Sequence, residues 1–294
     1  MKKVAVITHD MNLPNAHLIF NALKKRTDAH LIDLHRLRVA AFPRKWNVFC
    51  PRIRMKEFDT VYFRGCLVPS IVFDFRLTVS EHLEGMGIDV INSSKTARIC
   101  RNKFSVMQAL QKHGVPTPKT RLALTPSAAM RSIRKMKKPV IIKLISGSHG
   151  KGVMKISSND EAESVIDALW ALGEMLYFQE FVEACGKDIR AFVVGDEVVA
   201  AMERSARNGC FRSNISRGGR GQKIELDPKL EKLALKAAKV VGAEVAGVDI
   251  VLDGKPRVLE VNINPGLKIS RVTKVNVAGK IAEYIANKQK AKRQ

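Results

Sequence analysis

The most informative segment of the chain is Gly247-Val-Asp-Ile-Val-Leu-Asp-Gly-Lys-Pro-Arg-Val-Leu-Glu-Val-Asn-Ile-Asn-Pro-Gly266. We interpret it as two short strands joined by a two-residue turn within Asp253–Lys255. Side chains alternate between the faces of a strand, so Glu260 and Asn262 share one face, and the turn brings Asp249 to the same face. The side chains expected on the opposite, core-facing side are Val248, Ile250, Leu259 and Val261. Two carboxylates and an amide oxygen on one face are typical of a Mg²⁺ site that meets nucleotide phosphates.

The composition is that of a globular protein without membrane spans. A chain of 294 residues should hold about two domains, at roughly 100–200 residues each. No apolar run approaches the roughly 18 residues that cross a membrane. The run Val4–Thr8 is too short for a signal peptide and predicts a first strand. The five cysteines are scattered without a CxxC pair, which favours a reducing cytoplasm over a disulfide framework or a zinc site.

The charge is the second strong signal in the sequence. The net charge is +23 and the isoelectric point is about 10.1. Such an excess indicates a negatively charged partner, which can be nucleic acid, a nucleotide, an acidic peptide or a polycarboxylate. The alternative is a general adaptation to the ionic interior of the cell or an attachment to ribosomes.

The first 94 residues alternate strand-like and helix-like stretches, which is typical of a parallel sheet with helices on its faces. Strands are expected at Val4–Thr8, Leu31–Leu34 and Thr60–Phe63, and a helix at Ala16–Lys25. The segment Ser93–Thr96 contains helix-capping residues and marks a domain boundary. The next helix carries Phe104, Met107 and Leu110 and ends at Gly114.

Helices and strands also alternate over the rest of the chain. The expected helices are Thr125–Met136, Glu161–Leu172, a helix between the capping pair Asp227-Pro228 and Gly242, and Val277–Ala286. The expected strands are Pro139–Ile145, Tyr177–Val182, and a hairpin of Ile189–Val194 with Val198–Met202.

Two features of the middle segment point to phosphate. The glycine-rich stretch Ser146–Gly152 follows a strand, so its backbone N–H groups can turn toward a phosphate, although the P-loop spacing is absent. The alternative is a mobile hairpin loop. Lys143 interrupts an apolar strand, where a lysine is costly to bury without an anionic partner. The alternative for Lys143 is an edge strand that lets it reach solvent. Lys103 lies in the helix that follows the first domain, and its spacing alone favours a solvated helix face.

Three further segments carry polar groups with weaker signals. Gln179–Val182 joins a strand to a turn at a domain junction, where adenine commonly lies. Asp188 and Arg190 on one hairpin strand, and Glu203 and Arg204 on the other, are typical of surface ion pairs. The basic loop of Phe211–Asn214 and Arg217–Arg220 offers Arg212 and Arg217 to a phosphate or carboxylate, unless it is disordered.

Taken together, these segments resemble the ATP-grasp superfamily, and within it the RimK-like glutamate ligases. The segments that carry the resemblance are Cys185–Arg204, Phe211–Asn214, Arg217–Gly219, Val245–Asp249, Glu260–Asn262 and Pro265–Leu267. The resemblance implies an α/β (α+β) ATP-grasp fold in three parts. These are a Rossmann-like N-terminal pre-ATP-grasp domain (1–94), a central lid subdomain (95–180) and a C-terminal subdomain with the metal site (181–294).

The resemblance also implies the reaction and the residues that serve it. An acceptor carboxylate attacks the γ-phosphate of ATP to give an acyl phosphate, and the amine of an amino acid, usually glutamate, displaces the phosphate. One or two Mg²⁺ or Mn²⁺ ions are expected at Asp249, Glu260 and Asn262. Arg212 and Asn214 are the expected catalytic residues. The expected nucleotide-binding residues are Lys103, Lys143, Ser148, Gly150, Gln179, Glu180, Phe181, Val182, Asp188, Arg212 and Asn214.

The acceptor is expected to be acidic, because the stretch Lys268–Lys274 after Pro265-Gly266 is unusually basic. A protein C-terminus, a carrier protein of amino-acid biosynthesis and a coenzyme carboxylate all fit this description. A different class of function is an RNA- or ribosome-binding protein on a retired ATP-grasp scaffold. A homo-oligomer is compatible with the sequence, which contains no signal for or against one.

Overall fold

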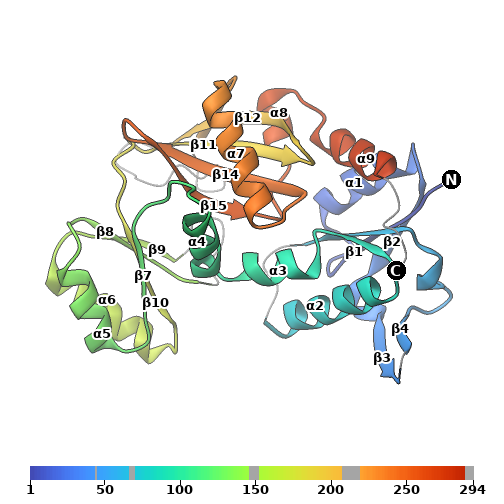
Figure 1. Ribbon diagram of the computed structural model, residues 1–294, viewed down its shortest axis with the longest axis horizontal. Helices are drawn as coiled ribbons and strands as arrows, with labels where there is room; N and C mark the ends of the chain where they lie inside the picture. The colour runs from blue at the N-terminus through green and yellow to red at the C-terminus, as the bar shows by residue number, and fades with distance from the viewer. Residues whose placement is uncertain (44, 66–69, 146–151, 207–218, 289–294) are drawn as a thin grey trace.

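The computed structural model describes residues 1–43, 45–65, 70–145, 152–206 and 219–288. The described chain forms three main sheets and a small hairpin. Figure 1 places the first sheet on the right, the second at the lower left and the third above and between them. Within the described ranges, no helix combines the length and apolarity needed to cross a membrane.

The first sheet is parallel, as the alternating pattern predicts. Its strand order is β2-β1-β5-β6, formed by β1 (Lys3–Thr8), β2 (Asp28–Asp33), β5 (Thr60–Arg64) and β6 (Asp89–Ile91). Alternate residues of β1 enter two different cores: Val4 and Val6 pack in one, and Ala5 and Ile7 in the other. Both faces of the strand are therefore buried, which explains its continuous apolar run.

Helices cover both faces of this sheet. The helices α1 (Pro14–Lys24) and α9 (Val277–Asn287) lie side by side on one face and α2 (Ser70–Gly85) covers the other (Figure 1). The sequence did not predict the antiparallel hairpin of β3 (Arg38–Phe42) and β4 (Lys45–Phe49), which projects beside α2. Two short 3₁₀ turns, η1 (Leu34–Arg36) and η2 (Met55–Glu57), complete this part.

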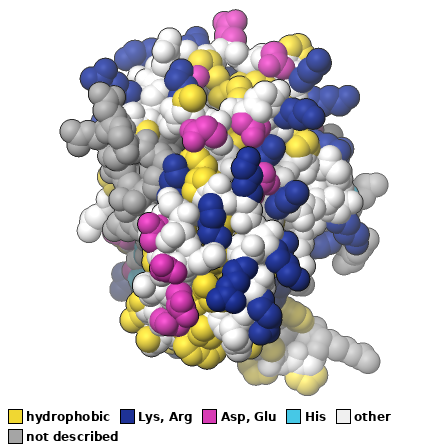
Figure 2. Space-filling model, turned by 90° about the vertical axis from the view of Figure 1, so that its left-hand side faces the viewer, with side chains coloured by type: hydrophobic (Ala, Val, Ile, Leu, Met, Phe, Trp, Pro, Cys, Tyr) yellow, Lys and Arg dark blue, Asp and Glu magenta, His cyan; other side chains and the backbone are white. Residues whose placement is uncertain are grey.

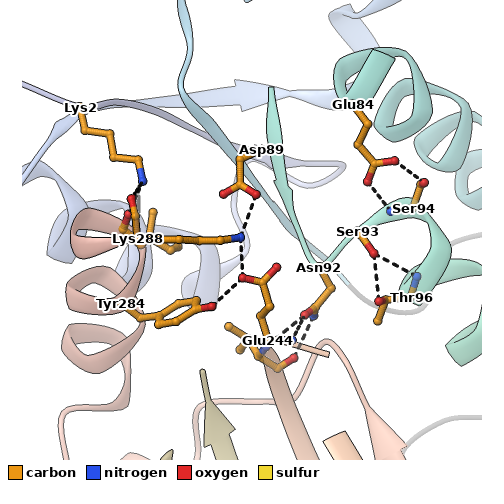
Figure 3. A network of polar contacts seen from close by, with 12 residues as sticks. Lys2, Glu84, Asp89, Asn92, Ser93, Ser94, Thr96, Glu244, Tyr284 and Lys288 are labelled. Carbon is orange, nitrogen blue, oxygen red and sulfur yellow. Dashed lines mark hydrogen bonds and ion pairs between the residues drawn. The ribbon is translucent and has the colours of Figure 1, made fainter. Parts of the chain in front are cut away.

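A polar connection joins the first sheet to the third one. The buried side chain of Asn92 donates to the carbonyls of Val245 and Ile263 and accepts from the amides of Glu244 and Val245 (Figure 3). In the same network Lys288 pairs with Asp89 and Glu244 at 2.8 and 2.6 Å. The sheets are thus held together by a side chain that satisfies backbone groups, in addition to apolar contacts.

Two helices follow this connection. Ser93 caps α3 (Ser94–Arg101) by accepting from the amide of Thr96, which confirms the predicted cap. Asn102 caps α4 (Lys103–Lys112) in the same manner, through the amides of Phe104 and Ser105. The break between the two helices puts Lys103 in the first turn of α4.

The second sheet is antiparallel, in the order β7-β10-β8-β9. Its strands are β7 (Thr120–Ala123), β8 (Val140–Lys143), β9 (Val153–Ile156) and β10 (Leu176–Glu180). The helices α5 (Pro126–Arg134) and α6 (Asn159–Ala171) pack on one face through a shared apolar core. The predicted strands here are too long at their C-terminal ends, because β8 ends at Lys143 and β10 at Glu180.

The third sheet is also antiparallel, in the order β13-β12-β11-β14-β15. Its strands are β11 (Lys187–Val194), β12 (Glu197–Ser205), β13 (Arg220–Lys223), β14 (Val245–Leu252) and β15 (Pro256–Asn262). The helix α7 (Pro228–Val240) packs on one face, together with α4. Phe192, Val194 and Val245 point from the opposite face into the core shared with β1, α8 (Ile269–Thr273) and α9. The predicted division at residues 94 and 180 stays a prediction.

Candidate active site

The strands β14 and β15 bring the three expected metal ligands to one face. Asp249 lies directly opposite Glu260, and Gly247 lies opposite Asn262. Directly opposed residues of an antiparallel pair project to the same side. The prediction that Asp249, Glu260 and Asn262 share a face is therefore confirmed, and this face is the one opposite α7.

The turn that achieves this alignment differs from the prediction. Leu252 pairs with Pro256, so the turn Asp253–Lys255 has three residues. Such a turn alone would place Asp249 opposite Leu259. The register shifts beyond Ile250, and Leu259 is the extra residue of a β-bulge that restores the pairing with Glu260. The prediction that Leu259 faces the core is wrong, because Val258 occupies that position.

Asp249 is held by two arginines. Nε and Nη2 of Arg190 each donate to one carboxylate oxygen at 2.7 Å, and Nη2 of Arg204 lies 2.9 Å from Oδ2. Burial by itself raises the pKa of Asp249, but the charges and hydrogen bonds of Arg190 and Arg204 bring it down to about 2. Asp249 is therefore a carboxylate at all physiological pH values.

Arg204 also holds Asp188. Both residues are buried, and the guanidinium donates to both carboxylate oxygens, with Nε 2.7 Å from Oδ1. The four side chains Asp188, Arg204, Asp249 and Arg190 thus form one continuous ion-pair network. The expectation of surface ion pairs within each strand is wrong, because these pairs cross between β11, β12 and β14. Glu203 does form a surface pair, with Lys187 at 2.9 Å.

Glu260 differs from Asp249 in having no such partner. Its carboxylate forms no hydrogen bond or ion pair with any residue in the described part of the chain, and it is half-buried. Burial lowers the pKa of Lys143 and of Lys103, and the negative charge of Glu260 opposes that lowering. Glu260 therefore lies within electrostatic range of two lysines that belong to other elements.

The two lysines lie across from Glu260, on α4 and on the second sheet. Lys143 donates to Oε1 of Gln179 at 2.6 Å, and Lys103 donates to the carbonyl oxygen of Ile145 at 2.8 Å. Burial lowers the pKa of both amines, that of Lys143 to about 8. Since β8 is an inner strand and Lys103 reaches the second sheet, the sheet-edge and solvated-helix alternatives are wrong.

The expected adenine segment lies at the end of β10. Gln179 is fully buried beneath Lys143, so its side chain supports the lysine and has no solvent-facing surface. Glu180 accepts from the amide of Lys119 and pairs with Arg257 at 3.4 Å. The ring of Phe181 carries the ammonium of Lys155 4.1 Å from its centroid, and Val182 is buried. This segment therefore joins the second sheet to β15 through Arg257.

The remaining expected residues, Ser148, Gly150, Arg212 and Asn214, lie outside the described residues. Sequence reasoning missed Arg190 and Arg204 as partners of the metal-site carboxylate. The alternation along β11 contains the signal, because Asp188 and Arg190 share the face opposite the core residues Ile189 and Ala191.

The oxygen donors fit a hard divalent cation. Glu260 has no partner among the described residues, and Oδ1 of Asn262 accepts only the amide of Asn264, at 2.9 Å. Each oxygen of Asp249 that binds Arg190 keeps capacity for a further contact. No group of three or more histidine, cysteine or acidic side chains suited to a metal exists in the described ranges. The candidate site consists instead of two carboxylates and one amide, which suits Mg²⁺ shared with phosphate oxygens.

Comparison with known proteins agrees with this geometry. The family model of the RimK-like ATP-grasp domain matches residues 100–285. A "Probable alpha-L-glutamate ligase" of Legionella pneumophila (strain Corby) is 40% identical over 240 residues, which cover 80% of this chain and 78% of that protein. A "Probable alpha-L-glutamate ligase 1" of Hahella chejuensis (strain KCTC 2396) is 36% identical over 296 residues, 99% of this chain and 97% of the relative.

Solved structures agree on the fold. The ATP-grasp ligase PsnB, complexed with its minimal precursor, Mg and ADP, superposes with a TM-score of 0.74 at 21% identity and covers 96% of this chain and 97% of PsnB. This likeness concerns the fold. The chain belongs to the RimK-like ATP-grasp family and is an ATP-dependent ligase.

Proposed function

We propose that this enzyme joins the amino group of glutamate to a carboxylate of an acidic acceptor, after activating that carboxylate as an acyl phosphate. The observation that carries the proposal is the placement of Glu260. This carboxylate, which has no partner among the described residues, lies within electrostatic range of the amines of Lys143 and Lys103. Nucleotide phosphates placed between them would have cations on one side and a metal-binding carboxylate on the other.

The residues have separate roles in this proposal. Lys103 and Lys143 bind phosphate oxygens, and Gln179 orients Lys143 by accepting a hydrogen bond from its amine. Glu260, Asn262 and Asp249 hold Mg²⁺, which when bound neutralises the phosphates toward an incoming anion. Arg190 and Arg204 keep Asp249 ionised and fixed in position. Glu180, Phe181, Val182 and Asp188 border the nucleotide in this proposal, as do Ser148 and Gly150, and Arg212 and Asn214 act on the transferred phosphate.

The acceptor in this proposal is a peptide or a small molecule with several carboxylates. The relatives are named as probable glutamate ligases, and PsnB is complexed with a precursor peptide. The basic residues Lys268, Arg271 and Lys274 on and beside α8 follow the metal-site strand and support an acidic acceptor. A cytoplasmic site of action is part of the proposal and rests on the scattered cysteines.

The test is glutamate-dependent release of ADP. Purified enzyme with ATP, Mg²⁺, labelled glutamate and a cell extract, split into protein and small-molecule fractions, should transfer label to one fraction. Mass spectrometry should then find products heavier by whole glutamate residues. Release of ADP that ignores glutamate, or label that enters neither fraction, would remove glutamate from the proposal.

The RNA-binding alternative has less support. Lysine and arginine side chains cover much of the face shown in Figure 2, but acidic side chains lie among them, and the positive charge there does not form a single patch. A scaffold that had lost its catalytic function would also not be expected to keep two half-buried lysines near Glu260. Salt-sensitive RNA binding by a protein that fails to bind ATP would favour the alternative.

A further inference from the structure

A second cluster of positive charge lies outside the site described above, at the end of β5. Arg64 is the last residue of this strand and is only 3% exposed. Its Nη2 donates to the carbonyl oxygen of Pro265 at 2.5 Å. Its Nη1 is enclosed and has no hydrogen-bond partner among the residues that the structure describes. The carboxyl ends of parallel strands are the usual place for ligands in such sheets.

Arg76 of α2 adds a second guanidinium to this place. The guanidinium carbon lies 5.0 Å from the centroid of the Phe63 ring, and Nε is enclosed without a hydrogen-bond partner in the described ranges. Burial, partly offset by Tyr62 and reinforced by the positive charge of Arg64, lowers the pKa of Arg76 to about 10. The two guanidinium groups are therefore close enough to repel one another.

No described acidic residue neutralises this pair. Neither Arg64 nor Arg76 takes part in any ion pair formed within the described part of the chain, whereas Arg190 and Arg204 are both paired. The hydroxyl of Tyr62, on the same face of β5 as Arg64, is also buried and lacks a described partner. Enclosed guanidinium and hydroxyl groups without acceptors are unfavourable unless a ligand supplies them.

The cluster adjoins the loop that follows the metal-site strand. Pro265, which binds Arg64, comes three residues after Asn262, and the amide of the Asn264 side chain donates to the carbonyl oxygen of Gly65. A Cβ atom at Gly65 would lie 2.3 Å from Nδ1 of His9, so the His9 ring packs directly on this backbone. The end of β5 is thereby fixed beside the candidate active site.

We propose that Arg64 and Arg76 form the subsite that binds a carboxylate of the acceptor, with the hydroxyl of Tyr62 as a further donor. A guanidinium offers parallel N–H donors that match the two oxygens of a carboxylate. The lysines of α4 and β8 would serve the phosphates, and the basic segment Lys268–Lys274 follows Pro265, whose carbonyl oxygen binds Arg64. The inference rests on the proposed function, because it assumes that the enzyme takes an acidic acceptor.

Isothermal titration with the peptide triglutamate, without nucleotide, tests the subsite in the full chain. Arg76→Gln should weaken triglutamate binding at least tenfold and leave binding of ADP with Mg²⁺ unchanged. Its Tm should equal or exceed that of wild type, because a repelled charge is removed. Arg131→Gln, which removes the same charge from α5, is the matched control and should bind triglutamate as wild type does.

Arg76→Met, which keeps the stem packed on Phe63, decides the question if the Gln variant folds poorly. The inference is overturned if wild type does not bind triglutamate, if folded Arg76 variants bind it normally, or if Arg131→Gln loses as much. Weaker binding of free glutamate alone would assign the subsite to the incoming amino acid and also overturn it. Glutamate-dependent ADP release by wild type, measured separately, tells whether the proposed function itself has failed.

Discussion

Arg190 on β11 donates two hydrogen bonds of 2.7 Å to Asp249 on the neighbouring strand β14. Both side chains lie on the face of the sheet that carries Glu260 and Asn262. The metal-site carboxylate is thus bound before any cation arrives. A cation held at this candidate site would share Asp249 with Arg190, whereas the carboxylate of Glu260 has no competing partner among the described residues. The following predictions rest on this division between a paired and an unpaired carboxylate.

Asp249→Asn should destabilise the protein as well as abolish ligase activity. The substitution leaves Arg190 and Arg204 buried with one negative charge fewer, and the loss of one partner from a buried ion pair costs about 3–5 kcal/mol. Urea unfolding should show this loss in the free energy of unfolding. Glu203→Gln removes only the surface pair with Lys187 and should change it by less than about 1 kcal/mol. Equal stability of wild type and Asp249→Asn would contradict the buried network.

Glu260→Gln should reduce the ligase activity without the large loss of stability expected for Asp249→Asn. Because the Glu260 carboxylate has no hydrogen-bond or ion-pair partner among the described residues and only attracts Lys143 and Lys103 at longer range, its neutralisation should lower the Tm far less than Asp249→Asn does. Activity should fall by a factor on the order of 10²–10³, the typical cost of losing one electrostatic contact to a transition state. Glu163→Gln, an exposed change on α6, serves as the control in both assays. A Tm that falls as far as that of Asp249→Asn would mean that Glu260 has a structural role.

Lys143 should make the stability of the free enzyme depend on pH. Its pKa in the folded state is about 8, against an ordinary 10.5. Between these values the unfolded chain binds more protons, so the stability rises with pH. Below about pH 8 the Lys143 amine is protonated in both the folded and the unfolded state, so the folded state bears the full free-energy cost of burying the charge. Wild type should therefore gain up to about 3 kcal/mol relative to Lys143→Met as the pH rises through this range.

The measurement is a series of urea unfolding curves at fixed ionic strength, with the two proteins compared at each pH. Subtracting Lys143→Met removes the titration of all other groups. Parallel stability curves for the two proteins between pH 8 and pH 10.5 would show that the Lys143 amine is not buried as described.

Asn92→Ala should loosen the connection between the first and third sheets. Asn92 makes four hydrogen bonds to the backbone of Glu244, Val245 and Ile263. Each buried backbone group left without a partner costs about 1–3 kcal/mol. The Tm should fall markedly, and hydrogen exchange should rise at the amides of Glu244 and Val245. Asn12→Ala, at an exposed position, should change neither; an unaltered exchange rate in Asn92→Ala would contradict the connection.

Much of the fold follows from local patterns in the sequence. The continuous apolar run before Thr8 gives a strand buried on both faces, and Ser93 and Asp227 cap the helices expected after them. The hairpin of β3 and β4 was missed because its strands, Arg38–Phe42 and Lys45–Phe49, are short and largely exposed. Its position depends on tertiary contacts with α2 that no local pattern specifies.

The candidate site, like the fold, was predictable from the sequence only in part. Alternation along β14 and β15 predicted that Asp249, Glu260 and Asn262 share a face. It could not predict that Arg204, from another strand, lies between Asp188 and Asp249, because that depends on the register of three strands. The resemblance named Lys103 and Lys143 as phosphate ligands. Only the packing of α4 against the second sheet shows that burial lowers the pKa of both amines.

The β-bulge at Leu259 has a consequence for protein engineering. It compensates for the three-residue hairpin tip, so that Glu260 faces Asp249 although the tip alone would place Leu259 there. Nothing lies within 4 Å of a Cβ atom built at Gly254, and Leu252, two residues before it, is 44% exposed. Residues 253–255 therefore form an insertion point for a purification tag or a fluorescent reporter, beyond the strand pairs that align Asp249 with Glu260.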